Sequence, residues 1–359
     1  MKRVPLICLA LAIPVLLLAL SFGCSEKSNW SVPSVMLESI PTTIAPRIDG
    51  DAFDREWLSA PELLIAMSDK NGNLGGNFYL KMKSVYTVYP DTVYFLLQWA
   101  DTTDDVLPDR LFYIGEPWQA KNCRVTEELI DPANWIVQPS EYEKEDRFCL
   151  MFEITPVSDE TGTFASRGCQ TACHGRMNPP AGKLDVWYWM RARTDAVSRC
   201  DDMVTDSLSL RGDSGEGIWR TNRRDGTFVP KYIPRWGNGD LSPAKFVYDP
   251  GPWGQIFNPC DTVNPASLLP WNDPRDPEPD YVPSYVVKFP AGSRGDVKAK
   301  GEWDEGRWTV ELRRAMRTGQ EAEDVAFYIG RSYNFAVAIM NGSRTIHSGS
   351  VPLVLKFRQ

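Results

Sequence analysis

The sequence predicts an all-β protein, a β-sandwich with long irregular insertions. Segments rich in β-branched and aromatic residues recur along the chain, and several of them alternate apolar with polar side chains, as half-buried strands do. Helical periodicity is scarce by comparison. Sheet-on-sheet packing is therefore the architecture that this pattern favours.

Seven segments carry the strand pattern most clearly. In the last part of the chain, RWTVELR places Trp308, Val310 and Leu312 on one face and charged or hydroxyl residues on the other. That period of two is the period of a strand with one buried face. The seven segments are 91–101, 146–154, 185–193, 284–289, 306–314, 333–340 and 351–357.

The first 24 residues have the form of a secretory signal peptide. Lys and Arg precede an apolar run over 4–22, and the small residue Gly23 precedes Cys24. The run is also long enough to remain as an uncleaved membrane anchor. Gly23-Cys24 resembles a bacterial lipoprotein processing site, although Ser21 stands where an apolar residue is usual. We expect an exported protein on the periplasmic or cell-surface side, anchored through a lipid on Cys24; an ordinary cleaved signal is the alternative.

The remainder is expected to form a tether and one domain. Residues 25–45 are polar and contain prolines, which is typical of a linker. The sandwich domain is expected over 46–359, beginning at PRIDGDAFDREW. Within it, 200–283 is rich in Pro, Gly and Trp, and we expect a long ordered excursion there. The formal net charge of −8 argues against nucleic acid as a partner.

Six cysteines follow Cys24, and export would allow disulfides among them. Two of the six lie close together near the middle of the chain. If those two serve another purpose, the other four allow two disulfides in any of three pairings, or they remain buried free thiols. The four are Cys123, Cys149, Cys200 and Cys260.

The motif GCQTACHG, residues 168–175, places His174 directly after a close cysteine pair, Cys169 and Cys173. The C-x-x-C-H haem attachment motif has one residue fewer between its cysteines. Three sites fit: a covalent haem with His174 on the iron, a disulfide beside an incidental histidine, or a zinc site that lacks its fourth ligand. The chain has two histidines, and one of them in this position favours haem.

The surroundings of the motif resemble a known family. FASRGCQTACHG, followed by DVWYWMRARTD and DDMVTDS, is similar to the c-type branch of the haem-binding domain related to the gamma subunit of ethylbenzene dehydrogenase and dimethyl-sulfide dehydrogenase. VYFLLQWADTT, GEWDEGRWTVELRRAMRTG and YNFAVAIMNGSRTIHSG agree in order, so the resemblance extends from about 46 to 357. It implies a sandwich like that of family 9 carbohydrate-binding modules, which share the start formed by Asp49, Gly50, Asp54 and Trp57.

The resemblance implies one haem c, bound covalently through Cys169 and Cys173 with His174 as the proximal iron ligand. In b-type relatives an axial lysine occupies the hairpin that corresponds to NGSRTIHSGS, so His347 is the expected distal ligand. Methionine also fills such positions. The methionine candidates are Met177 and Met190, followed by Met203 and Met340.

The aromatic pair Trp187 and Trp189 is expected to pack in the core, with haem contact as an additional role. Relatives carry W-x-W-K where Met190 follows the second tryptophan here. If that lysine orients a haem propionate, the contact is either missing here or reassigned to Arg191 or Arg193.

The function that follows is an exported monohaem c-type cytochrome that passes single electrons. Its partners would be redox proteins, such as the molybdenum and iron–sulfur subunits of a respiratory oxidoreductase. The sequence shows no pocket of paired acid and base groups, so electron transfer is favoured over catalysis. A carbohydrate-binding or adhesion module on the same sandwich and a haem-based sensor are the alternatives.

Overall fold

Strands dominate the part of the chain that the structure describes. The computed structural model describes residues 35–68, 78–106, 108–113, 132–137, 142, 144–160, 162–171, 182–206, 209–223, 225–230, 247–248, 281–282, 284–343 and 347–359. These residues fall within one unit, 32–359. Statements about elements below refer to these ranges.

The main sheet has 13 strands among the described residues, in the order β12-β11-β10-β7-β21-β22-β2-β3-β4-β20-β19, with β1 and β23 pairing off this path. The strands are β1 (Val35–Pro41), β2 (Leu63–Ser68), β3 (Phe78–Thr87), β4 (Thr92–Ala100), β7 (Arg147–Thr155), β10 (Lys183–Met190), β11 (Asp201–Thr205), β12 (Leu210–Gly212), β19 (Lys298–Asp304), β20 (Arg307–Ala315), β21 (Ser332–Met340), β22 (Ser348–Ser350) and β23 (Leu353–Phe357).

Short elements complete the described chain. The small sheets contain β5 (Leu111–Tyr113), β6 (Trp135–Ile136) and β16 (Tyr281–Val282); β14 (Trp219–Thr221), β15 (Val247–Tyr248) and β17 (Tyr285–Val287); β13 (Gly215–Glu216) and β18 (Ala291–Gly292); and β8 (Ser158–Asp159) and β9 (Gly162–Thr163). The helices are α1 (Arg55–Ser59) and α3 (Phe164–Arg167), and the 3₁₀ turns are η1 (Pro132–Asn134), η3 (Gly168–Thr171), η5 (Asp195–Val197) and η7 (Ser293–Gly295).

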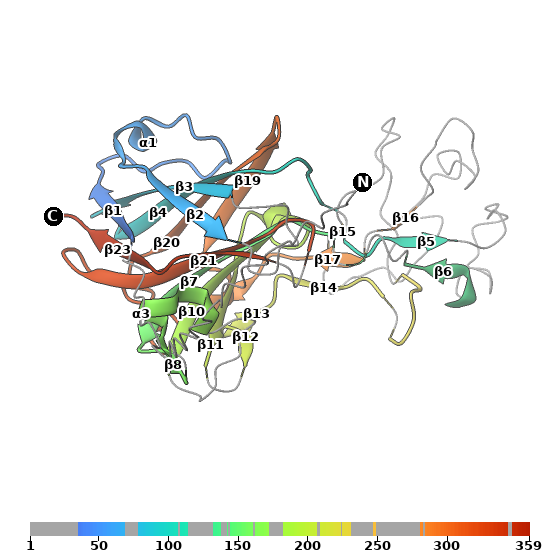
Figure 1. Ribbon diagram of the computed structural model, residues 1–359. Coiled ribbons are helices and arrows are strands. Elements are labelled where there is room, and N and C mark those ends of the chain that lie inside the picture. The colour runs from blue at the N-terminus through green and yellow to red at the C-terminus, as the bar shows by residue number, and fades with distance from the viewer. Residues whose placement is uncertain are drawn as a thin grey trace, which may run out of the picture. The chain divides into compact units, whose positions relative to one another are not determined.

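The main sheet folds over itself and encloses an aromatic core. Phe95 on β4 lies 5.8 Å from Phe152 on β7, and Trp99 on β4 lies 6.3 Å from Trp189 on β10, between ring centroids. These contacts hold β3, β4 and β20 over β7, β10 and β21, as Figure 1 shows. The all-β sandwich predicted from the alternation is confirmed.

Each of the seven predicted segments contains a strand. The segment 284–289 forms β17, which pairs with β14 and β15 in a small sheet instead of joining the main sheet. Its apolar residues Val286 and Val287 are buried all the same.

The tether predicted over 25–45 is wrong in its second half, because the fold begins with β1. This strand runs parallel to both β23 and β3. Its residues Leu37 and Ser39 are fully buried. One apolar residue in every two is a weak signal in a seven-residue segment, and the pairing partners are distant in sequence.

The predicted excursion over 200–283 is also shorter than expected at its start. β11 and β12 extend the main sheet from β10 by antiparallel pairing. Only short pieces of the remainder, among them β14 and β15, belong to the described residues.

The start of the predicted domain is held by one buried carboxylate. The Glu311 side chain on β20 accepts hydrogen bonds from the Trp57 indole at 2.7 Å and from the backbone N–H groups of Asp49 and Gly50 at 3.0 Å each. Asp49, Gly50 and Trp57 therefore hold the segment before β2 against Glu311 on β20, which accounts for the pattern at the domain start.

Candidate functional site

Cys169 lies in the turn η3, immediately after the short helix α3. Gly168 joins the two elements with φ of 57°, a left-handed conformation that favours glycine. A Cβ at Gly168 would lie 3.4 Å from the Cβ of Ala336 and 3.6 Å from the backbone of Pro352. The turn that carries the first motif cysteine is therefore pressed closely onto β21 and the start of β23.

The sulfur of Cys169 touches the backbone of β22. A Cβ at Gly349 would lie 2.7 Å from Cys169 Sγ, closer than a carbon and a sulfur can approach. Position 349 therefore has room for glycine alone while Cys169 keeps this position. Sequence patterns gave no sign of this contact, since 180 residues separate the two positions.

Around Cys169, the strands β7, β10 and β21 present a second apolar surface that points away from the aromatic core. We call it the Cys169 face. α3 contributes Phe164 and η3 contributes Cys169 itself. The strands contribute Cys149, Met151, Leu184, Val186, Ala336, Ala338 and Met340, and Tyr188 and Met203 pack at the margin.

A second thiol, Cys149, lies beside Cys169 on this face. Strand register aligns it in one row with Ala338 and Gly349, the residue that Cys169 touches. Burial raises the pKa of Cys149 well above its usual value. Cys149 is a neutral free thiol and not half of a disulfide. Cys200 is also a buried free thiol, so both residues follow the free-thiol alternative that the sequence left open; Cys123 and Cys260 lie outside the described residues.

His347 comes close to the same place. It lies two residues before Gly349, and two residues of chain span at most about 7 Å. Ala338 pairs with Gly349 and Ile339 with Ser348; one further pair in this register would set His347 opposite Met340. The structure thus brings the first motif cysteine and the predicted distal histidine to one end of one hairpin, although they are far apart in sequence.

Of the other predicted ligands and attachment sites, three methionines belong to the described residues and four residues do not. Met190 is buried at the end of β10, in strand alternation with Val186 and Tyr188 of the Cys169 face. Met203 and Met340 also belong to this face or its margin. Cys24, Cys173, His174 and Met177 lie outside the described residues.

Trp187 and Trp189 point into the aromatic core and not toward the Cys169 face. Both are fully buried, and Trp189 stacks on Phe148 with centroids 5.5 Å apart. Strand alternation places the β10 backbone between these indoles and the side of the sheet where Cys169 lies. The core role predicted for the pair is confirmed, and direct contact with a group on the Cys169 face is not supported.

A buried charged cluster lies beyond the margin of the Cys169 face. Glu145 accepts from Arg147 Nε at 2.9 Å and from the Arg193 guanidinium at 2.5 Å. The two guanidinium groups hold the pKa of Glu145 below its usual range despite its burial. Arg147 also donates to the Tyr188 hydroxyl at 3.3 Å. Two buried guanidinium groups, those of Arg147 and Arg193, thus share the Glu145 carboxylate.

Of the two arginines considered as replacements for the lysine of W-x-W-K, Arg191 is engaged in ion pairs away from the Cys169 face. Arg191 forms ion pairs with Asp104 at 2.7 Å and with Asp195 at 2.9 Å. Arg193 lies in the cluster around Glu145, with its guanidinium over Trp219 and Tyr285. Arg147, which sequence reasoning missed, stands on β7 in strand alternation with Cys149 and Met151 of the Cys169 face.

Two buried hydroxyl oxygens near Cys169 have no hydrogen-bond partner among the described groups. They belong to Thr171, two residues after Cys169, and to Ser348, next to Gly349. Buried polar atoms without partners are uncommon and call for an explanation, such as a missing ligand. A thiol, several methionines and an apolar surface lie beside these hydroxyls, and together they suit a mostly apolar ligand that also offers hydrogen-bonding groups.

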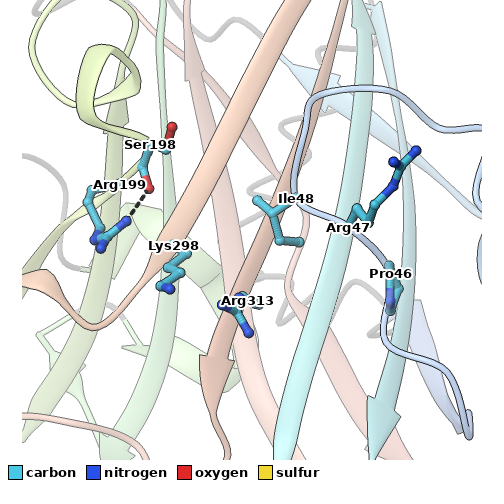
Figure 2. A pocket seen from close by; sticks show the side chains of 7 residues that line it. All are labelled: Pro46, Arg47, Ile48, Ser198, Arg199, Lys298 and Arg313. Atoms are coloured by element: carbon cyan, nitrogen blue, oxygen red, sulfur yellow. Dashed lines mark hydrogen bonds between the residues drawn. The ribbon is translucent and has the colours of Figure 1, made fainter.

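A separate cavity of about 450 Å³ lies beside β19 and β20. Figure 2 shows its lining residues, which are Pro46, Arg47, Ile48, Ser198, Arg199, Lys298 and Arg313. Lys298 and Arg313 stand directly opposite each other on β19 and β20. The Arg313 guanidinium lowers the pKa of Lys298. None of the lining residues belongs to the Cys169 face, so this basic cavity is not part of the candidate site.

The fold and the site together define a class: a β-sandwich domain with a thiol-bearing turn folded over an apolar face of its sheet. The chain belongs to the ethylbenzene dehydrogenase family, whose model matches residues 55–351. The match includes Cys169, Gly349 and His347. The resemblance found in the sequence is thereby confirmed at the level of the family.

Among solved structures, the chain is similar to a family 9 carbohydrate-binding module from Caldicellulosiruptor kristjanssonii in complex with glucose. The identity is 8%, the alignment covers 90% of this chain and 97% of that chain, and the TM-score is 0.34. No curated protein sequence matches the chain. Within the described ranges, no helix has the length and apolar character to cross a membrane.

Proposed function

We propose that this protein is an exported monohaem c-type cytochrome that transfers single electrons within an oxidoreductase assembly. The observation that carries the proposal is the contact of Cys169 with Gly349, two residues from His347. A cysteine of C-x-x-x-C-H and the second histidine of the chain thus lie at one end of an apolar face. Family membership supports the oxidoreductase context.

In this proposal Cys169 and Cys173 would hold the haem through thioether bonds, each formed by addition of the thiol across a haem vinyl group, and His174 would be the proximal iron ligand. His347 is the distal ligand, with Met190 and Met177 as the alternatives. Bound haem supplies one-electron oxidation and reduction, and the axial ligands and burial set its potential.

The remaining residues of the site act through solvation and charge. The apolar side chains of the Cys169 face exclude water, which disfavours the more highly charged redox state. The guanidinium groups of Arg147 and Arg193, which pair with Glu145, would favour an anionic group at that end. A haem propionate is such a group.

An electron carrier requires a donor and an acceptor, so we propose protein partners, including molybdenum and iron–sulfur subunits. Nucleic acid is not among them.

We further propose that the protein is exported and held at the membrane by a lipid on Cys24. Fatty-acid analogue labelling should mark the wild type and spare Cys24→Ser. Equal labelling of both proteins would refute the anchor.

Cysteine variants test the haem assignment directly. The wild type, produced with c-type maturation, should keep a haem stain after denaturing electrophoresis. Cys169→Ser should leave a single thioether and shift the reduced pyridine haemochrome band to longer wavelength, because one vinyl group is then unsaturated. The double variant Cys169→Ser, Cys173→Ser should lose the covalent stain altogether.

Cys149→Ser is the matched control, because Cys149 lies on the same face but outside the motif. It should keep the wild-type haemochrome band. A wild type without covalent stain, or a double variant that keeps it, would contradict the proposal.

A further inference from the structure

Four buried carboxylates gather at the β11 end of the main sheet, away from the Cys169 face. Asp185 on β10, Asp202 on β11 and Asp324 before β21 each place one oxygen within 4.8 Å of the others. Asp213, after β12, lies beside them, and its N–H donates to the Asp202 carbonyl at 3.1 Å. All four are at most 4% exposed.

One cation of the described chain lies inside this group. Arg314 on β20 is fully buried and places NH1 2.5 Å from Asp185 Oδ2, 3.4 Å from Asp324 Oδ1 and 3.8 Å from Asp202 Oδ2. The neighbouring Arg294 is engaged with Asp201, at 2.6 Å and 2.9 Å. These four carboxylates, together with Asp296 beside Asp202, therefore face the Arg314 guanidinium, and a buried uncompensated charge costs several kcal/mol.

The carboxylate oxygens are also short of donors. Both oxygens of Asp202, both of Asp213 and Oδ1 of Asp185 are buried and accept no hydrogen bond. Asp213 is not one of the three residues that define the cluster, yet both of its carboxylate oxygens are buried beside it. They lie against the carboxylates of Asp185 and Asp324.

We propose that Asp185, Asp202, Asp213 and Asp324 bind a calcium ion. Oxygen-only, carboxylate-rich sites suit hard divalent cations, and Ca²⁺ accepts six to eight oxygens at about 2.3–2.6 Å in flexible geometry. Two ligands across such an ion are about 5 Å apart, which agrees with oxygens lying within 4.8 Å of one another. Mg²⁺ demands stricter geometry and keeps its waters.

The ion would join parts of the chain that the sheet alone leaves apart. Asp185 and Asp202 belong to adjacent strands, whereas Asp324 lies in the loop after β20. In that loop the Val325 carbonyl accepts a hydrogen bond from the Arg314 guanidinium at 2.6 Å. Calcium would then brace the β10–β11 edge against the loop after β20. The proposal does not depend on haem.

The test begins with the full-length protein as purified, with metal content measured by plasma mass spectrometry. We expect about one calcium per chain that survives gel filtration and leaves on treatment with EGTA. Adding CaCl₂ back to the depleted protein should raise its melting temperature, and equal MgCl₂ should raise it less. Haem absorbance is recorded in parallel, so that loss of haem and loss of calcium are separated.

Asp202→Asn and Asp213→Asn should lose the calcium-dependent shift. Asp304→Asn is the matched control, because Asp304 is exposed at the end of β19, and it should keep the full shift. If neither cluster variant folds, the calcium content and EGTA response of the wild type decide alone. A wild type that holds no calcium and shows no CaCl₂ shift would overturn the proposal, and a shift with MgCl₂ alone would overturn the assignment to calcium.

Discussion

The sulfur of Cys169 lies directly against the backbone of Gly349, where a Cβ would come within 2.7 Å of Sγ. This contact joins the turn of the C-x-x-x-C-H motif to the hairpin that carries His347. Cys169 and Gly349 are 180 residues apart in the sequence. The fold therefore brings the two positions together.

Gly349→Ala should push η3 away from β22, because the new methyl group occupies the place of the Cys169 sulfur. We expect a loss of about 1–3 kcal/mol in the free energy of unfolding, the usual cost of overpacking. Chemical denaturation measures it. In the Cys169→Ala background the same substitution should cost clearly less, since the colliding sulfur is gone. Equal costs in both backgrounds would show that the contact does not limit position 349.

His347→Ala should open one axial position without releasing the haem, since three attachments remain in the motif. The ferrous spectrum should become high-spin, and carbon monoxide should bind readily. His347→Met should stay low-spin with a higher potential, because histidine–methionine ligation raises it. Met190→Leu is the control. If His347→Ala keeps the wild-type spectrum and Met190→Leu changes it, the distal ligand is methionine.

Glu145→Gln should destabilise the protein strongly, because it removes the buried negative charge that the guanidinium groups of Arg147 and Arg193 share. Breaking a buried pair in this way costs about 3–5 kcal/mol. Asp91→Asn removes the partner of Arg317, which is an exposed pair, and should cost less than about 1 kcal/mol. Urea unfolding of both variants makes the comparison. Equal small losses would show that Glu145 is not the anchor of its cluster.

Glu311 should make stability depend on pH. Burial raises its pKa to about 7, whereas the unfolded chain should titrate it near about 4.3. Between those values the native state binds more protons, so its stability should fall as pH rises from about 4 to about 7. Glu311→Gln removes this titration. The stability difference between wild type and variant should change across the window by up to about 3 kcal/mol; a constant difference would contradict the assignment.

Alternation along the strands was sufficient to predict the sandwich, because each long strand buries one face. It did not reveal β1, where a short strand depends on the distant partners β3 and β23. Alternation also placed Trp187 and Trp189 on a common face. Alternation does not tell whether that common face points into the aromatic core or toward Cys169. The structure shows that both indoles lie in the core.

The motif residues were predictable from local spacing, whereas their surroundings were not. Cys149, Gly349 and Arg147 reach the site through strand register and through a turn folded over the sheet. The same holds for Asp202 and Arg314, whose contact joins segments more than 100 residues apart. Such contacts follow from tertiary packing and leave no local pattern in a single sequence.

The central claim is that haem is bound covalently through the motif of Cys169. The most direct measurement is the intact mass of the purified protein under denaturing conditions, after expression with c-type maturation. We expect the mass of the processed chain, with whatever modification it carries, plus one haem, and a loss of that increment in Cys169→Ser, Cys173→Ser. A wild-type mass without the haem increment, with any haem extracted into acidified organic solvent, would contradict it.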